Sequence, residues 1–329
     1  MYFIGIDISK AKLDCSLLLE RQSTKRRAKS VANSASGVDA LLDWCVQKQN
    51  ILPHELHVVL EATGVYHETA ATLLVDAGVT VSIVNPAQVK DFARSLGIRT
   101  KTDGIDSLVL ARYGDLLNPR PWTPPTPEIR ELKALVARRE AILQDLQREH
   151  NRQEKAQATN TPPRVLKSIT ESIEFLEKQL TQLERDLDDH IHRHPRLKTD
   201  YDLLISIPAV GPQVSYQMLS IIHSHHFQSA EQLAAYLGLV PIERQSGTSL
   251  HGRPRLSKAG PARVRAVLYM AAIVGTRYNP HIQALYQRLQ KRGKSKKSAL
   301  GAAMRKLVHL CFGVLKTQQP YLHNYATQG

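Results

Sequence analysis

The chain has 329 residues, of which 42% are hydrophobic, so it is long enough for two domains with separate cores. Lysine and arginine together number 44 against 30 aspartates and glutamates, which gives a formal net charge of +14. Such an excess of positive charge attracts polyanions. Nucleic acid is the commonest partner of this kind, and a membrane surface is the alternative. No apolar run reaches the length of a bilayer span, and the early Asp7 argues against a secretory signal, so we expect no membrane partner.

The first part of the chain, residues 1–122, alternates short apolar strands with helical patterns. Ser36 is a candidate N-cap, and Gly78 is a candidate helix terminator. Strands at the start, followed by strands that alternate with helices, predict a mixed sheet flanked by helices. The predicted strands are 2–8, 13–20, 57–61 and 79–84, and the predicted helices are 36–49, 65–77 and those that continue through Tyr113.

A cluster of prolines between Pro119 and Pro127 marks a boundary, and two long, charged helical segments follow it. Residues 128–150 and 165–190 each carry a narrow stripe of leucine and isoleucine, and Thr161-Pro-Pro163 separates them. The pattern predicts an antiparallel helical hairpin or a dimerising coiled coil over residues 123–195. A plain structural spacer is the open alternative.

The last part, residues 196–329, is basic and mainly helical. The run Leu204-Ile-Ser-Ile-Pro-Ala-Val-Gly-Pro212 leads into a predicted helix over 214–222. An Ile-Pro-x-Val-Gly turn between helices is similar to a helix-hairpin-helix, whose backbone N–H groups point at a DNA phosphate.

Four acidic residues are candidates for a metal site. Asp7 ends the first strand, Glu61 ends a later strand, and Asp103 and Asp106 share one face of a predicted helix. Clustered carboxylates suit Mg²⁺ or Mn²⁺, and such ions can activate an attacking oxygen and stabilise a leaving one in phosphoryl transfer. The alternatives are a helix cap at Asp103, a solvated Asp106 and a salt-bridged Glu61. An aspartate inside an apolar strand is costly unless something binds it, so the set as a whole favours a metal site.

The motifs around these carboxylates resemble the transposases of the insertion sequence 110 family. The resemblance rests on Ile4-Gly-Ile-Asp-Ile-Ser-Lys10, Leu60-Glu-Ala-Thr-Gly-Val-Tyr66, Val84-Asn-Pro86 and Lys101-Thr-Asp-Gly-Ile-Asp106. It implies an RNase H-like (RuvC-like) N-terminal α/β domain in which Asp7, Glu61, Asp103 and Asp106 bind the metal.

The resemblance continues through the C-terminal region, where it implies a serine nucleophile. The matching run is Gly238-Leu-Val-Pro-Ile-Glu-Arg-Gln-Ser-Gly247, followed by Gly252-Arg-Pro-Arg255 and Ser257-Lys-Ala-Gly260. From spacing alone, Ser246 competes with Thr248, Ser249 and Ser257, and a turn serine that bonds its own backbone is the simpler interpretation. The family match selects Ser246.

Basic side chains near this serine, in the last helices and just before Asp103 are candidate phosphate contacts. A solvated surface run is the usual alternative for a charge cluster, and the net charge favours nucleic acid. The candidates are Lys101, Arg244, Arg253, Arg255, Lys258, Arg292, Lys294, Lys296, Lys297 and Arg305.

Taken together, the resemblance implies an enzyme that exchanges strands between the ends of an insertion element and target DNA. It implies a phosphoserine intermediate, a structured noncoding guide RNA, and a homo-oligomer that is a dimer, or a tetramer in synapsis. It also implies a cytoplasmic, nucleoid-associated protein of a bacterium or an archaeon.

Three other functions stay open from the residues. A junction-resolving nuclease would use the carboxylates alone, and a non-catalytic nucleic-acid-binding protein would cut nothing. A phosphotransferase of the sugar-kinase type is suggested by Gly5-Ile-Asp-Ile-Ser-Lys10, but no second glycine-rich phosphate loop accompanies it.

The positions of the histidines and cysteines in the sequence favour structural roles for these residues. The groups His190, His192, His194 and His223, His225, His226 follow helix ends, where histidine complements the helix dipole. The three cysteines, at 15, 45 and 311, lie far apart and are expected to be buried, reduced thiols.

Overall fold

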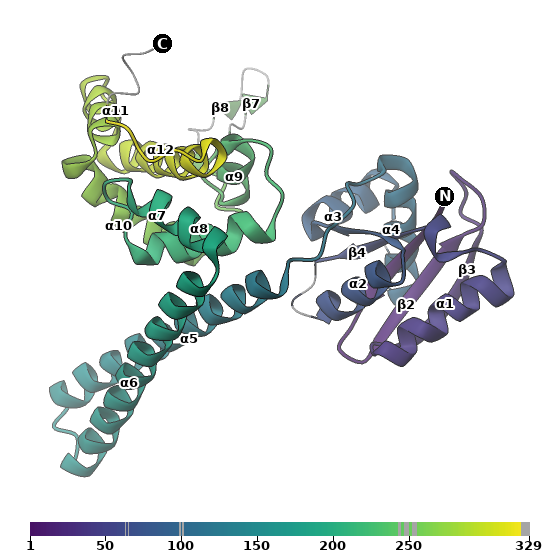
Figure 1. The fold of residues 1–329 in the computed structure, drawn as a ribbon, viewed down its shortest axis with the longest axis horizontal. Coiled ribbons are helices and arrows are strands. Elements are labelled where there is room, and N and C mark those ends of the chain that lie inside the picture. Colours follow the sequence, from purple (N-terminus) through teal and green to yellow (C-terminus); the bar gives the residue numbers. More distant parts are fainter. Residues whose placement is uncertain are drawn as a thin grey trace. The chain divides into compact units, whose positions relative to one another are not determined.

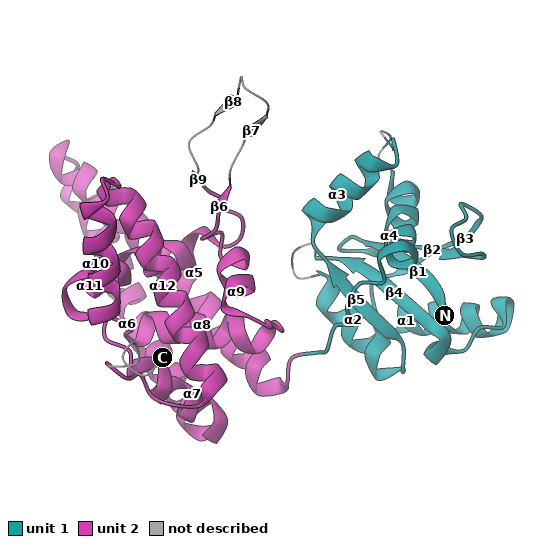
Figure 2. Ribbon diagram, turned by 90° about the horizontal axis from the view of Figure 1, so that it is seen from above, with its two compact units in different colours: residues 1–124 teal, residues 125–329 magenta. Residues whose placement is uncertain are grey.

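The computed structural model of the chain divides into two units, Met1–Pro124 (unit 1) and Pro125–Gly329 (unit 2), coloured separately in Figure 2. The structure describes residues 1–62, 64, 66–98, 100, 102–242, 245–246, 250–251 and 255–323. At residues 245, 246, 250 and 251 it describes the backbone alone.

Unit 1 is built on a five-stranded mixed sheet (Figure 1). The strand order is β3-β2-β1-β4-β5, with β1 antiparallel to β2 and parallel to β4. The mixed sheet and its helices confirm the predicted architecture and are compatible with an RNase H-like domain. The strands are β1 (Tyr2–Ile8), β2 (Lys12–Leu18), β3 (Arg26–Ala32), β4 (Leu56–Glu61) and β5 (Thr80–Val84).

Alternation along the strands gives the sheet two faces with different covers. Ile4, Ile6 and Leu60 pack on one face against α1 (Ala35–Gln49) and α2 (Tyr66–Asp76). Val59 and Val84 pack on the other face against α3 (Pro86–Ser95) and α4 (Asp103–Leu117). A short 3₁₀ turn, η1 (Pro53–Glu55), precedes β4.

Strand β1 and helix α4 pack in close contact. A Cβ atom added at Gly5 would lie 2.0 Å from the Ser107 carbonyl oxygen and 2.3 Å from the Ala111 nitrogen. The glycine therefore allows α4 to lie directly on the sheet, and its first turn then reaches the carboxyl end of β1.

One prediction about local structure was wrong, and one strand was missed. The N-cap of α1 is Ser34, whose Oγ accepts a hydrogen bond from the Gly37 N–H at 3.2 Å, and not Ser36. The strand β3 was not predicted, because its exposed sequence Arg-Arg-Ala-Lys-Ser-Val-Ala has the charges of a sheet edge and no apolar run.

Unit 2 begins with two long helices, α5 (Pro127–Ala158) and α6 (Pro163–Arg193), which pack antiparallel (Figure 1). Arg139 donates hydrogen bonds to Glu184, and Gln153 donates one to Thr170. Ile129, Leu132 and Val136 enter the main core of unit 2, so the hairpin is anchored in the body of that unit.

The body of unit 2 is a helical bundle, and its core includes Ala303, Leu307 and Val308 on the last helix, α12 (Lys296–Thr317). Among the described residues between Tyr236 and Ala262, four two-residue strands are present. The elements are α7 (Pro195–Ile205), α8 (Pro212–Ser224), α9 (Ala230–Tyr236), β6 (Pro241–Ile242), β7 (Gln245–Ser246), β8 (Leu250–His251), β9 (Arg255–Leu256), α10 (Ala262–Tyr278), α11 (Pro280–Lys291) and α12 (Lys296–Thr317).

Among the described residues, α12 alone is long and apolar enough to cross a membrane by length and composition. The expectation that no segment reaches that length is therefore wrong for this helix. Its buried side chains belong to the core of unit 2, as those of a core helix do.

Candidate carboxylate site and serine loop

Strand register places three carboxylates in one row across the sheet of unit 1. Asp7 on β1 pairs directly with Asp14 on β2, and cross-strand partners point to the same face. On the other side, Ile6 pairs with Leu60, so the next residues, Asp7 and Glu61, also share a face. This is the face that α4 covers, because Gly5 is two residues before Asp7 and contacts α4.

The first turn of α4 brings two further carboxylates to this row. Thr102 is the N-cap, and its Oγ1 accepts a hydrogen bond from the Ile105 N–H at 3.3 Å. Asp103 is therefore not the capping residue, and both Asp103 and Asp106 lie in the first turn. The positive end of the helix dipole favours carboxylates at these positions.

A lysine lies between two of these carboxylates. The Lys12 Nζ is 2.9 Å from Asp14 Oδ2 and 2.7 Å from Asp103 Oδ2. Hydrogen bonds from the ammonium to these two carboxylates raise the pKa of Lys12 above its ordinary value. The ammonium thus joins β2 to the start of α4, a contact that the sequence did not predict.

Negative charge is concentrated around Asp7. Its pKa is raised, first because the side chain is partly withdrawn from water and then because Asp106, Asp103 and Asp14 repel its charged form. The structure therefore gathers Asp103 and Asp106 around Asp7, with Glu61 beside Asp7 on the neighbouring strand, and adds Asp14, which sequence reasoning missed. Alternation in β2, with Leu13 and Cys15 buried and Asp14 between them, was the available signal.

The donor chemistry of this site fits a divalent cation. Carboxylate oxygens are the preferred ligands of Mg²⁺ and Mn²⁺. The Lys12 ammonium already bridges Asp14 and Asp103 as a cation. Among the described residues, no three histidine, cysteine, aspartate or glutamate side chains are arranged around a single ion position. Metal ligation by Asp7, Glu61, Asp103 and Asp106 therefore stays a prediction.

In unit 2, Ser246 lies in a loop whose base is closed by backbone pairing. Pro241 pairs with Leu256 and Ile242 with Arg255, and farther out Gln245 pairs with His251 and Ser246 with Leu250. The Ser246 backbone is thus in β7. Its side chain lies outside the part of the chain that the structure describes, so its role as nucleophile stays a prediction.

The base of this loop is held by two glycines and an arginine. A Cβ atom at Gly238 would lie 2.1 Å from the Ala259 carbonyl oxygen, and one at Gly260 would lie 2.0 Å from that of Tyr236. The Arg265 Nη1 donates to the carbonyl oxygens of Leu237, Ala259 and Gly260 at 3.2, 2.9 and 3.0 Å. Both ends of the loop are therefore fixed to α10.

Most of the predicted phosphate contacts that the structure describes are exposed. Arg292, Lys294, Lys296 and Lys297 lie between the end of α11 and the start of α12, and Arg305 is half-buried on α12. Arg255 and Lys258 are exposed near the base of the serine loop. Lys101, Arg244 and Arg253 lie outside the described residues.

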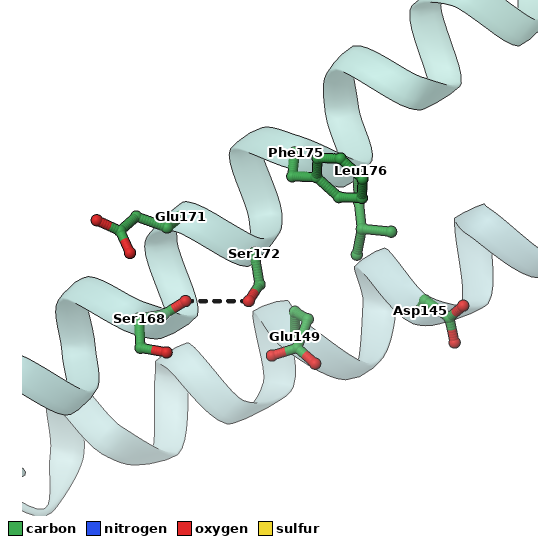
Figure 3. A pocket seen from close by; sticks show the side chains of 7 residues that line it. All are labelled: Asp145, Glu149, Ser168, Glu171, Ser172, Phe175 and Leu176. Atoms are coloured by element: carbon green, nitrogen blue, oxygen red, sulfur yellow. Dashed lines mark hydrogen bonds between the residues drawn. The ribbon is translucent and has the colours of Figure 1, made fainter.

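Figure 3 shows a pocket between α5 and α6 that contains none of the predicted site residues. The Ser172 hydroxyl donates to the Ser168 carbonyl oxygen at 3.0 Å, so that serine is already satisfied within its own helix. The pocket therefore contributes no residue to the carboxylate site or to the serine loop. Its lining is Asp145, Glu149, Ser168, Glu171, Ser172, Phe175 and Leu176.

The histidines at helix ends make contacts that stabilise the fold. The rings of His192, His194 and His225 each lie within hydrogen-bond distance of the carbonyl oxygen four residues earlier. The His190 ring nitrogen Nε2 lies 2.9 Å from the Glu128 carbonyl oxygen. All three cysteines are buried and free, as predicted.

Comparison with known proteins gives matches over nearly the whole chain. Residues 4–158 match the DEDD transposase model of the IS110 family, and residues 201–287 match the transposase model of the IS116/IS110/IS902 family. Pilin gene-inverting proteins of Moraxella lacunata and Moraxella bovis are each 34% identical over 323 residues, which is 97% of this chain and 97% of theirs. An uncharacterized 43.6 kDa protein of insertion element IS110 from Streptomyces coelicolor is 27% identical over 159 residues, or 48% of this chain and 38% of its own length.

Proposed function

Since this chain belongs to the IS110 family of transposases, we propose that it cuts and rejoins DNA with Ser246 as nucleophile and a divalent cation at the carboxylates of unit 1. The observation that supports this most directly is the meeting of Asp7, Asp103 and Asp106 at the carboxyl end of β1. The alternative is a junction-resolving nuclease, in which water activated at the same carboxylates attacks the DNA phosphate.

The serine step exchanges one phosphodiester for another. The Ser246 hydroxyl attacks phosphorus and loses its proton, a DNA oxygen leaves and gains one, and the strand becomes joined to the protein. Reversal by a different DNA hydroxyl rejoins the strand, so no external energy source is needed. Arg244, Arg253 and Arg255 are proposed to hold the phosphate, because guanidinium groups bind two phosphate oxygens together.

Residues of unit 1 would hold the cation. Asp7, Glu61, Asp103 and Asp106 would bind Mg²⁺ or Mn²⁺, which when bound stabilises the developing negative charge on oxygen.

Nucleic-acid binding follows from the charge and from the family. We infer that the exposed basic residues from Arg292 to Lys297 contact phosphates of DNA and of an element-encoded guide RNA. The turn between α7 and α8, in which Ala209 has a φ of 78°, is proposed to contact phosphate as a helix-hairpin-helix does. The hairpin of α5 and α6 is proposed to act as a coiled coil in a dimer or tetramer.

DNA inversion is a second candidate outcome of the same chemistry. The Moraxella relatives, which match this chain over 97% of its length, are named for inversion of a pilin gene. A conservative recombinase excises, integrates or inverts a segment according to how its two sites are oriented. We therefore propose that substrate arrangement, and not a different active site, separates transposition from inversion here.

The test combines purified protein, co-purified RNA, Mg²⁺ and a labelled junction DNA, with products separated on a denaturing gel before and after protease treatment. We expect a protein-linked DNA strand that disappears in Ser246→Ala and in Asp103→Ala. Ser249→Ala is the matched control, because it removes a nearby hydroxyl and is expected to keep the adduct.

Other results would favour other functions. Free nicked strands without an adduct, unchanged in Ser246→Ala, would show a nuclease that uses water. Tight DNA binding with no cleavage under any condition would leave a non-catalytic nucleic-acid-binding protein.

A further inference from the structure

We propose that Asp14 is a fifth acidic member of the carboxylate site and that Lys12 is its resident cation, displaced when a divalent ion binds. The proposal deepens the proposed function, because it assumes that this site takes a divalent cation. It concerns two residues that neither the sequence motifs nor the family's four carboxylates include.

The backbone holds Lys12 and Asp14 at the edge of the site. The turn between β1 and β2 is closed by a hydrogen bond from the Ser9 N–H to the Lys12 carbonyl oxygen at 3.0 Å. The Ser9 hydroxyl lies 3.1 Å from the Lys12 nitrogen, which donates to it. Lys12 and Asp14 are two residues apart on a strand, so both side chains leave the same face as Asp7.

Negative charge gathers around Asp7, and Lys12 lies at its edge. Asp106, Asp103 and Asp14 each act on the charge of Asp7, and the Lys12 ammonium pairs with Asp14 and Asp103. Arg26, a second cation beside the start of α4, donates to neutral oxygens of Ser16 and Gly104 instead. The Lys12 ammonium carries a single charge, so a divalent ion in its place would be attracted more strongly by the same two carboxylates.

Displacement of Lys12 costs little. Its side chain is 48% exposed, so the ammonium can turn into water without being buried elsewhere. An exposed lysine pair is worth only about 0.2–1 kcal/mol, and lysine is a strongly hydrated point charge on a flexible stem. The Asp14 side chain, at 18% exposure, stays beside Asp7 whether or not the lysine is present.

Two consequences follow. Lys12 keeps Asp14 and Asp103 from repelling each other while no metal is bound, and it competes with the metal afterwards. Removal of its charge is therefore expected to weaken the metal-free fold of unit 1 and to strengthen metal binding.

The experiment titrates the full-length protein, without nucleic acid, with Mn²⁺ and measures free Mn²⁺ by electron paramagnetic resonance. Lys12→Met is expected to tighten binding on the order of fivefold, the factor that corresponds to an exposed ion pair of about 1 kcal/mol. Asp14→Asn is expected to weaken binding by a similar factor. Lys12→Arg, which keeps the charge, and Lys10→Met, which changes an exposed neighbour, are expected to match the wild type.

Thermal unfolding gives a second readout that also tests for misfolding. Without metal, Lys12→Met is expected to melt below the wild type, and Mn²⁺ is expected to restore the difference, because a ligand that binds only the folded state stabilises it. A variant that is merely misfolded would show no such recovery.

The failures of the two proposals are distinguishable. If Asp7→Asn abolishes Mn²⁺ binding while Lys12→Met and Asp14→Asn bind as the wild type does, the carboxylate site stands and the roles of Lys12 and Asp14 are wrong. If neither the wild type nor Lys12→Met binds Mn²⁺ saturably, the metal function itself is wrong, and the inference falls with it.

Discussion

The carboxylate site of unit 1 and the serine loop of unit 2 are positioned in different ways. Asp7, Asp14 and Glu61 are fixed by the register of three paired strands, and Asp103 by a helix packed on the same sheet. Ser246 instead lies in a ladder of two residue pairs at the end of a loop. The first site depends on a core, while the second depends on the loop base at Arg265 and its two glycines.

This difference bears on when each site becomes complete. An isolated two-stranded ladder is marginal in water, so we expect DNA or RNA to contribute to the final geometry around Ser246. The carboxylates are already gathered in the protein alone. Metal binding and strand attachment should therefore be separable by mutation.

The largest expected effect tests that separation. Asp7→Asn and Ser246→Ala should each lower the rate of recombination by roughly a thousandfold or more, because loss of a group that acts in the chemistry typically costs that much. Mn²⁺ binding measured without nucleic acid should be lost in Asp7→Asn and kept in Ser246→Ala. Equal loss of metal binding in both variants would contradict the independence of the two sites.

The next effect concerns the contact that places α4 on the sheet. Gly5→Ala puts a Cβ atom 2.0 Å from the Ser107 carbonyl oxygen, so α4 or β1 must shift. Forced overpacking of this kind costs about 3 kcal/mol, and urea unfolding of unit 1 should shift accordingly, with Mn²⁺ binding weakened. Gly313→Ala on α12 meets no neighbour within 4 Å and should be neutral or stabilise by up to about 1 kcal/mol.

The same contrast explains what the sequence revealed about unit 1. The strands 2–8 and 57–61 were predicted almost to the residue because apolar runs bounded by turns leave few alternatives. Their order then puts Asp7 and Glu61 on neighbouring strands. Asp14 and Lys12 were missed. Alternation in β2 marks Asp14 as polar between two buried residues, but its position beside Asp7 depends on the β1–β2 register, and the contact of Lys12 with Asp103 depends on where α4 begins.

Irregular or exposed segments were harder to predict from the sequence. The edge strand β3 has no buried apolar run, and the start of α1 at Ser34 depends on Gly37 fitting against the Ala32 carbonyl oxygen, 1.9 Å from where a Cβ would stand. For Ser246, spacing alone left four candidate hydroxyls, and only the family match selected one. A nucleophile in a loop gains its properties from surroundings that periodicity does not encode.

A smaller effect is expected at the base of the serine loop. Arg265→Ala leaves the carbonyl oxygens of Leu237, Ala259 and Gly260 without their shared donor, at a cost of about 1–3 kcal/mol. Residues 241–256 should then be cut faster in limited proteolysis, and strand attachment should slow while Mn²⁺ binding is unchanged. Arg263→Ala, which removes an exposed partner of Glu140, is the matched control and should leave both unchanged.

The smallest predicted effect is a pH-dependent contribution from unit 2 that unit 1 should not share. Burial alone would raise the pKa of Asp200, but the contact with His223 Nε2 at 2.9 Å and the hydrogen bond from Gln318 outweigh it and hold the pKa below its ordinary value. A carboxyl group whose pKa is lower in the folded state stabilises the fold above its unfolded pKa of about 4 and loses that contribution as pH falls through the folded pKa.

Asp200→Asn should therefore lower the free energy of unfolding of unit 2 by about 1 kcal/mol at pH 7, measured by urea titration, and the deficit should shrink at pH 3. Asp202→Asn, which changes an exposed residue of the same helix paired with Lys198, should show a much smaller change at either pH. A deficit in Asp200→Asn that is as large at pH 3 as at pH 7 would mean that the loss comes from altered packing rather than from charge. Because this carboxylate ties the start of unit 2's bundle to Gln318 after α12, its pH dependence reports on the body that carries the serine loop, independently of the carboxylate site.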